Sequence, residues 1–99
     1  MRKVYLQYWE ESERGWGVRP DGCSLHLTLE DNKNYVEDIY KSRENDKEVP
    51  YEYDRIVGEA IECMIDPILF TLVTPSLRIS QYEMNNLIKL EELVLVCDI

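Results

Sequence analysis

The sequence is poor in basic residues and has a single histidine. Eleven Lys and Arg residues stand against 20 Asp and Glu residues, so the 99-residue chain has a formal net charge of −9. Nonspecific binding to nucleic acid depends on Lys and Arg that neutralise phosphates, so this balance excludes a protein that coats DNA or RNA. It favours a basic partner instead. A chain of this length forms one core, which predicts a single domain over residues 1–99 and excludes a large multi-step enzyme.

Long hydrophobic runs and paired cysteine motifs are also missing. The longest mainly apolar run, Ile68 to Val73, is far short of the roughly 20 residues that span a bilayer, and no signal pattern follows Met1. We therefore expect a soluble, cytoplasmic protein that does not contact a membrane. The three cysteines, Cys23, Cys63 and Cys97, are far apart and form no C-x-x-C pair, which suggests neither a disulfide framework nor a zinc site. We expect each to act as a small buried hydrophobe.

Alternating side chains predict a small β-sheet. Residues 3–9 and 23–27 alternate as two antiparallel strands of one sheet would. Strand 3–9 is bulky on both faces, so we expect both faces to be covered. Residues 59–65, 77–79 and 93–97 are further strand candidates because branched and apolar residues dominate them.

Three stretches predict irregular structure. Residues 10–17 carry charge and two glycines, which is typical of a turn or a wide loop. Residues 19–22, with the sequence Arg-Pro-Asp-Gly, have Pro where a β-turn fixes φ and Gly where the chain leaves it. The charged stretch 41–54 has no regular periodicity, and we interpret it as an exposed connection within the single domain.

Capping signals predict where the helices begin. Thr28 is an N-cap for a helix through about Arg43, and Tyr35, Val36, Ile39 and Tyr40 form its apolar stripe. Asp66 and Pro67 begin a short helix, and Ser80 to Glu83 is the capping box of a helix through Glu92. Together these elements predict an α+β fold: a small antiparallel or mixed sheet of three to five strands with two main helices packed on one face.

The segment 15–26 is the candidate binding site. Trp16 stands between two glycines, which weaken both helix and strand, so it is either a core anchor or a stacking surface. Arg14, Arg19 and His26 bring hydrogen-bond donors to the same segment, which also contains Asp21. An aromatic plane beside Arg is suited to a nucleotide base and its phosphate.

A plainer interpretation of the segment stays open. In it, Trp16 plugs the end of the sheet, Arg19 pairs with a nearby carboxylate, and Ser24 and His26 are outward residues of an ordinary strand. Ser24 and His26 share a face, but side chains two apart on a strand lie some 7 Å from each other, which disfavours catalysis by this pair. One His without converging acids or thiols predicts no metal site, and nothing predicts a cofactor.

A family resemblance adds a biological context. Residues Tyr5 to Asp31, YLQYWEESERGWGVRPDGCSLHLTLED, resemble short acidic proteins of bacteriophages and bacterial mobile elements whose activities are uncharacterised. The similar stretch covers about a third of the chain, and no catalytic or binding residue is carried over from it. The resemblance implies an anti-defence role inside a bacterial host cell, because small acidic phage proteins often act as stoichiometric inhibitors of host defence.

Two functions follow as expectations, with an enzyme that degrades a signalling nucleotide as a third alternative. The first is a non-enzymatic inhibitor that presents an acidic surface to a basic nucleic-acid-handling protein such as a CRISPR effector, a type of inhibition known as anti-CRISPR. The acidic surface residues are Glu44, Asp46, Glu48 and Glu52. The alternative is a module that sequesters a signalling nucleotide through Trp16, Arg19 and His26, with a possible site at a homo-oligomer interface. Acidity that serves only solubility explains the same charge.

Overall fold

The computed structural model describes residues 2–13, 17–44, 52–86 and 94–97. Its elements follow one another as β1 (Arg2–Glu13), β2 (Gly17–His26), α1 (Leu29–Glu44), β3 (Glu52–Ile65), α2 (Pro67–Phe70), β4 (Ser76–Ile79), α3 (Gln81–Asn86) and β5 (Val94–Cys97). The strands form one five-stranded sheet in the order β4-β2-β1-β3-β5, and every neighbouring pair is antiparallel. The predicted α+β class with a small antiparallel sheet is therefore confirmed.

The three capping signals are confirmed. The Thr28 hydroxyl accepts the Asp31 N–H at 3.0 Å, and the Asp66 carboxylate accepts the Ile68 N–H at 2.7 Å. At α3, the Ser80 hydroxyl oxygen accepts the Glu83 N–H at 3.1 Å and donates to the Glu83 carboxylate. These side chains satisfy N–H groups that have no partner within the helix, which fixes each helix start.

Helix α1 covers one face of the sheet. Tyr35 and Tyr40, from its predicted apolar stripe, meet the Trp9 ring edge-on at centroid distances of 6.0 and 6.4 Å. The Tyr40 hydroxyl also accepts the Ile56 N–H of β3 at 3.1 Å. Aromatic rings in edge-to-face contact add to the stabilisation from burial, so this contact holds α1 against the sheet.

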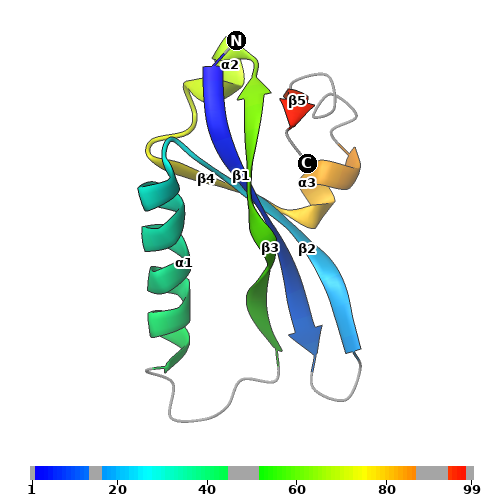
Figure 1. Cartoon of the computed structure of the whole chain (residues 1–99). Coiled ribbons are helices and arrows are strands. Elements are labelled where there is room, and N and C mark those ends of the chain that lie inside the picture. The colour runs from blue at the N-terminus through cyan, green and yellow to red at the C-terminus, as the bar shows by residue number, and fades with distance from the viewer. Residues whose placement is uncertain (1, 14–16, 45–51, 87–93, 98–99) are drawn as a thin grey trace.

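The hydrophobic core lies on the other face. Its members come from the three central strands, from α2 and the segment after it, and from β4, namely Val4, Leu6, Cys23, Leu25, Cys63, Ile65, Leu69, Val73 and Ile79, with Met84 of α3 packed against them. Figure 1 shows α1 along one side of the twisted sheet and α3 on the opposite side. We expected two main helices on one face, whereas α1 is the one long helix among the described residues and the two lie on opposite faces. Alternation along β1 explains this, because Val4 and Leu6 face the core while Trp9 faces α1.

The β1–β2 hairpin is longer than predicted. Residues 10–13, expected in a loop, continue β1, and Glu11 pairs with Arg19 in the ladder. The expected β-turn at residues 19–22 is part of β2, and β1 changes register between Tyr8 and Glu10. Charged residues occupy a strand here because Glu11 is held by Arg19 at 3.1 Å. Strand β3 likewise begins at Glu52, inside the stretch expected to be irregular.

Gly22 lets β2 approach the start of α3. Its φ is +79°, and a Cβ atom there would lie 2.0 Å from the Ile79 carbonyl oxygen. The Gly22 N–H donates to the Gln81 side-chain oxygen at 3.0 Å. Glycine is required at this position because any side chain would collide with the backbone of β4.

The cysteines differ from one another. Cys23 is buried and free, as expected of a small hydrophobe. Cys63 is also buried but is disulfide-bonded, so the prediction that no cysteine forms a disulfide is wrong for this residue. The residue opposite Cys63 in the β3–β5 ladder is Cys97. Strand pairing places Cys97 opposite Cys63 although the two are far apart in the sequence, and no spacing motif predicts this pairing.

None of the helices that the structure describes is long and apolar enough to cross a bilayer. The cytoplasmic compartment stays a prediction.

Candidate functional site

A chain of hydrogen bonds lies between the sheet and α1. The Trp9 Nε1–H donates to the Ser24 hydroxyl at 2.8 Å, Ser24 Oγ lies 2.7 Å from His26 Nε2, and His26 Nδ1 lies 2.7 Å from Ser76 Oγ. Ser24 accepts from Trp9 and so has its own proton to donate to Nε2. The Nδ1–H of His26 then donates to Ser76, and in this tautomer every atom of the chain is satisfied.

Burial closes this chain to solvent. Ser24 and His26 both have 0% of their surface exposed, and Trp9 has 1%. Burial lowers the pKa of His26 to about 4, against a smaller opposing effect of Asp31, so the imidazole is neutral at physiological pH. The expectation that Ser24 and His26 are outward residues some 7 Å apart is wrong, because α1 covers their face and they bond directly. Without access to substrate, this hydroxyl–imidazole pair is a structural link.

Arg78 continues the polar face toward the hairpin end of the sheet. Its guanidinium lies 4.6 Å from the centre of the Trp9 ring. It donates to the Asp21 carbonyl oxygen at 2.9 Å and lies 3.4 and 3.3 Å from the carboxylates of Asp21 and Asp54. Arg78 thus ties β4 to β1, β2 and β3 through one ring contact and two ion pairs.

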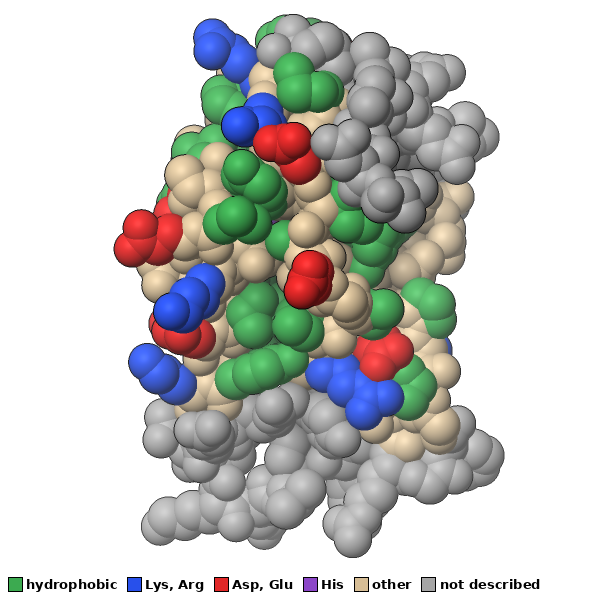
Figure 2. All heavy atoms as spheres, viewed as in Figure 1, with side chains coloured by type: hydrophobic (Ala, Val, Ile, Leu, Met, Phe, Trp, Pro, Cys, Tyr) green, Lys and Arg blue, Asp and Glu red, His purple; other side chains and the backbone are tan. Residues whose placement is uncertain are grey.

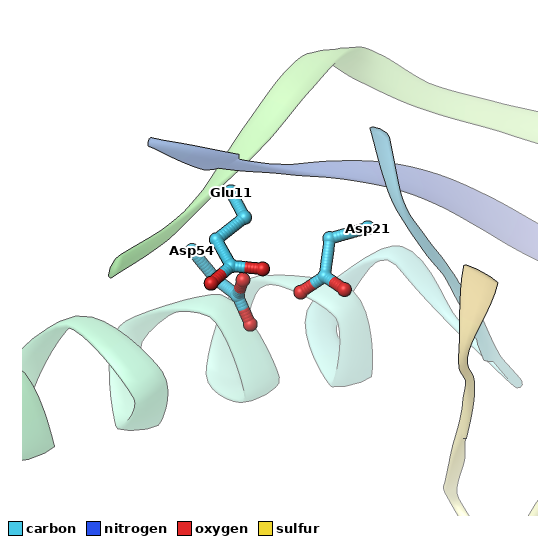
Figure 3. A group of neighbouring side chains, drawn as sticks. All are labelled: Glu11, Asp21 and Asp54. Carbon is cyan, nitrogen blue, oxygen red and sulfur yellow. The ribbon is translucent and has the colours of Figure 1, made fainter. Parts of the chain in front are cut away.

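Three carboxylates gather around this arginine. Glu11, Asp21 and Asp54, one from each of the three central strands, place carboxylate oxygens within 4.8 Å of one another on the side of the sheet where α1 runs (Figure 3). Burial, then the hydrogen bond and charge of Asp21, raise the pKa of Asp54 to about 7, and Arg78 opposes that rise. Carboxylate spacing of this kind is compatible with a hard cation. Here Arg78 pairs with Asp21 and Asp54, and Arg19 pairs with Glu11, so the group is an ion-pair cluster.

A hollow opens on the other face, beside α3. Its volume is about 410 Å³, and its lining consists of Tyr8, Trp9, Glu10, Val18, Arg19, Pro20, Gly22, Val57, Gln81 and Met84. Tyr8, Val18 and Val57 are 40%, 48% and 43% exposed, so this part of the sheet carries apolar side chains that the described residues leave open to solvent. Contiguous apolar surface of this kind is typical of an interaction site. We call it the α3-side hollow.

The predicted binding residues that the structure describes, Arg19, Asp21 and His26, do not form one site. Trp16 and Arg14 lie outside the described residues. Arg19 is exposed and pairs with Glu11 and Glu13 at 3.1 and 2.9 Å, in agreement with the plainer interpretation. His26 is enclosed under α1, and Asp21 is engaged by Arg78. A ligand surface made of Arg19 and His26 is therefore excluded in this structure, because His26 is not accessible.

The predicted acidic surface is placed only in part. Asp46 and Glu48 lie outside the described residues, while Glu44 ends α1 and Glu52 begins β3. On the face seen in Figure 2, acidic and basic side chains are interspersed with hydrophobic ones, and neither sign forms a continuous field there. The charge of −9 is thus a property of the whole chain and not of that face.

Local sequence patterns do not mark four residues of these sites: Trp9, Arg78, Asp54 and Val57. The sequence places Trp9 in a strand with bulky residues on both faces. That pattern correctly indicates that the Trp9 side chain is covered. Arg78 and Asp54 meet Asp21 across 57 and 33 positions of sequence, so no local spacing marks them. Val57 lies between the expected loop, residues 41–54, and the expected strand, residues 59–65, so neither prediction includes it.

Comparison of this chain with family models, with curated proteins and with solved structures gives no match. The resemblance of residues 5–31 to phage proteins therefore stays a prediction.

Proposed function

We propose that this protein is a stoichiometric binding protein, without catalytic activity, that occupies a basic surface of a bacterial nucleic-acid-handling protein. The observation that carries the proposal is the exposed apolar surface of the α3-side hollow, on Tyr8, Val18 and Val57, in a chain of net charge −9. Apolar patches left open on small domains mark contacts with other proteins. A strong negative charge speeds and orients encounter with cationic surfaces.

The arrangement of reactive groups supports a binding role. The hydroxyl and imidazole of Ser24 and His26 are buried and satisfied by Trp9 and Ser76. The carboxylates that gather at Asp54 are held by Arg78. Reactive groups engaged in this way stabilise the fold. Contacts with a partner would then be made by the outer surface.

Sequestration of a nucleotide is the second candidate. It is favoured by the volume of the hollow, about 410 Å³, and by Arg19 at its border. Small-molecule sites have volumes of roughly 300–1,000 Å³. Against it, Arg19 already pairs with two carboxylates, and His26 lies outside the hollow.

Affinity capture tests the two candidates together. Tagged protein is incubated with bacterial lysate at low and at physiological salt, and the eluate is analysed by mass spectrometry for proteins and for nucleotides. We expect a basic nucleic-acid-binding protein whose capture weakens as salt rises, because exposed charges are screened over about 8–10 Å. The purified pair should then fail to bind the partner's nucleic acid. A nucleotide without protein would support the second candidate.

Charge-reversal variants provide the control. Converting Glu44, Asp46 and Glu48 to Lys tests the predicted acidic surface, and converting Glu30, Glu37 and Asp38 of α1 to Lys changes the net charge equally. If the first group is the contact surface, its variant should slow association more than the α1 variant does. If both variants slow association equally, the effect is due to overall charge. Capture that changes with neither salt nor charge reversal would contradict the proposal.

A further inference from the structure

We propose that the α3-side hollow anchors an apolar side chain of the partner that has Lys or Arg residues beside it. This inference rests on the proposed function and names the chemistry of the segment recognised. It is carried by three observations: how the hollow is built, how its apolar lining is exposed, and the net charge of the chain that holds it.

The hollow is built by four elements of the fold. Tyr8 comes from β1, Val18 and Pro20 from β2, Val57 from β3 and Met84 from α3. The close approach at Gly22, with its N–H bonded to Gln81, brings α3 against β2 at the border of the hollow. Strands and a short helix fixed to them hold the lining in place, which is the arrangement expected of a preformed pocket.

The lining is apolar in a place where a sheet is normally covered. At the hairpin end of the sheet, α1 and its tyrosines cover the face that holds Trp9. On the opposite face, Tyr8, Val18 and Val57 are each at least 40% exposed. Since apolar side chains on a covered sheet face are usually buried, a partner side chain that packs into the hollow would cover this part of the sheet.

The chain that carries the hollow is acidic overall. Among the described residues, Glu10 and Arg19 line the hollow and Glu10 pairs with Arg55, whereas Glu11, Asp21 and Asp54 gather on the opposite face, where α1 runs. A net charge of −9 is complementary to a basic segment. A second copy of the chain would bring another charge of −9 to the same surface, which disfavours self-association.

Two labelled peptides and three variants test the anchor. The first probe is a fluorescein-labelled peptide of about ten residues in which Lys and Leu alternate, and the second has Ser in place of every Leu. Binding of each is measured by fluorescence anisotropy to the wild-type chain and to Val57→Ser and Val18→Ser. Ile68→Ser serves as a matched control, because Ile68 is 77% exposed on α2 and lies outside the hollow.

We expect the Lys–Leu peptide to bind the wild type at least about tenfold more tightly than the Lys–Ser peptide. Val57→Ser and Val18→Ser should remove that difference and leave Lys–Ser binding unchanged, while Ile68→Ser should change neither. All three variants should keep the wild-type melting temperature, since the replaced side chains are exposed.

Each of the other outcomes would overturn the proposal that the hollow anchors an apolar side chain. Equal binding of both peptides would mean that charge alone attracts them, which removes the anchor and retains the proposed function. A preference for Lys–Leu that survives both hollow variants would place the apolar contact elsewhere. Absence of binding by either peptide would overturn the anchor independently of the capture experiment. A dimer in sedimentation that Val57→Ser dissociates would make a second copy the occupant.

Discussion

Removal of the Ser24 hydroxyl is the sharpest test of the buried polar chain. In Ser24→Ala, the Trp9 Nε1–H and His26 Nε2 lose the partners that they have at 2.8 and 2.7 Å, and both stay in a site closed to water. Each buried group left without a partner costs about 1–3 kcal/mol. We therefore expect Ser24→Ala to lower the free energy of unfolding by about 2–5 kcal/mol, a large share of the 5–15 kcal/mol typical of a domain.

Urea denaturation followed by circular dichroism measures this loss. Ser42→Ala is the control, since Ser42 is exposed on α1 and its replacement should change stability by less than about 0.5 kcal/mol. Trp9→Phe keeps an aromatic ring but removes the N–H donor. If Trp9 and Ser24 interact as described, the double variant should lose less stability than the sum of the single variants, by about 0.5–3 kcal/mol.

A loss in Ser24→Ala no larger than that in Ser42→Ala would refute the reasoning. It would mean that Ser24 faces solvent or that water replaces its hydroxyl. Strict additivity of the two substitutions would show that the hydroxyl and the indole N–H act separately.

Three further predictions concern titration and cysteine chemistry. Asp54 has a folded-state pKa of about 7 against an ordinary value of 3.8, so its contribution to stability is complete below about pH 4 and is lost as the pH rises through 7. Asp54→Asn should therefore raise the free energy of unfolding by about 1–2 kcal/mol at pH 8, a value reduced because Asp54 is partly exposed. The same substitution should make the free energy of unfolding vary less between pH 4 and 7. Identical pH profiles of stability for the variant and the wild type would contradict this. The lowered pKa of His26 has the opposite effect on stability, which is lost as the pH falls from 6.5 to about 4. The proton resonances of this single His should titrate near pH 4 and not near 6.5. Denatured, unreduced protein should show fewer than three thiols to Ellman's reagent and three after reduction, since Cys63 is disulfide-bonded; three thiols before reduction would contradict that bond.

Local signals predicted the elements with strong alternation or capping. The first two strands were correctly paired from alternation, and Thr28, Asp66 and Ser80 correctly marked three helix starts. These features depend on residues a few positions apart. The hairpin end was missed because its charged residues are typical of a loop, and only their pairing across β1 and β2 makes a strand of them.

The site depended on contacts that no local pattern contains. Burial of Ser24 and His26 requires Trp9 on another strand and Ser76, which lies 50 positions from His26. The cluster at Arg78 likewise draws one residue from each of four strands. The apolar surface of the hollow arises from the placement of α3 opposite α1, which alternation in β1 permits but does not determine.

A binding footprint on the isotopically labelled protein tests the central claim most directly. Backbone amide shifts are recorded while the Lys–Leu peptide is added, and the shifted residues are mapped on the sheet. We predict that the largest changes occur at Tyr8, Val18 and Val57 and on α3 near Met84, with α1 unaffected. Changes confined to α1, or none at the hollow while the peptide is bound, would contradict the claim that the exposed apolar face beside α3 is the recognition surface.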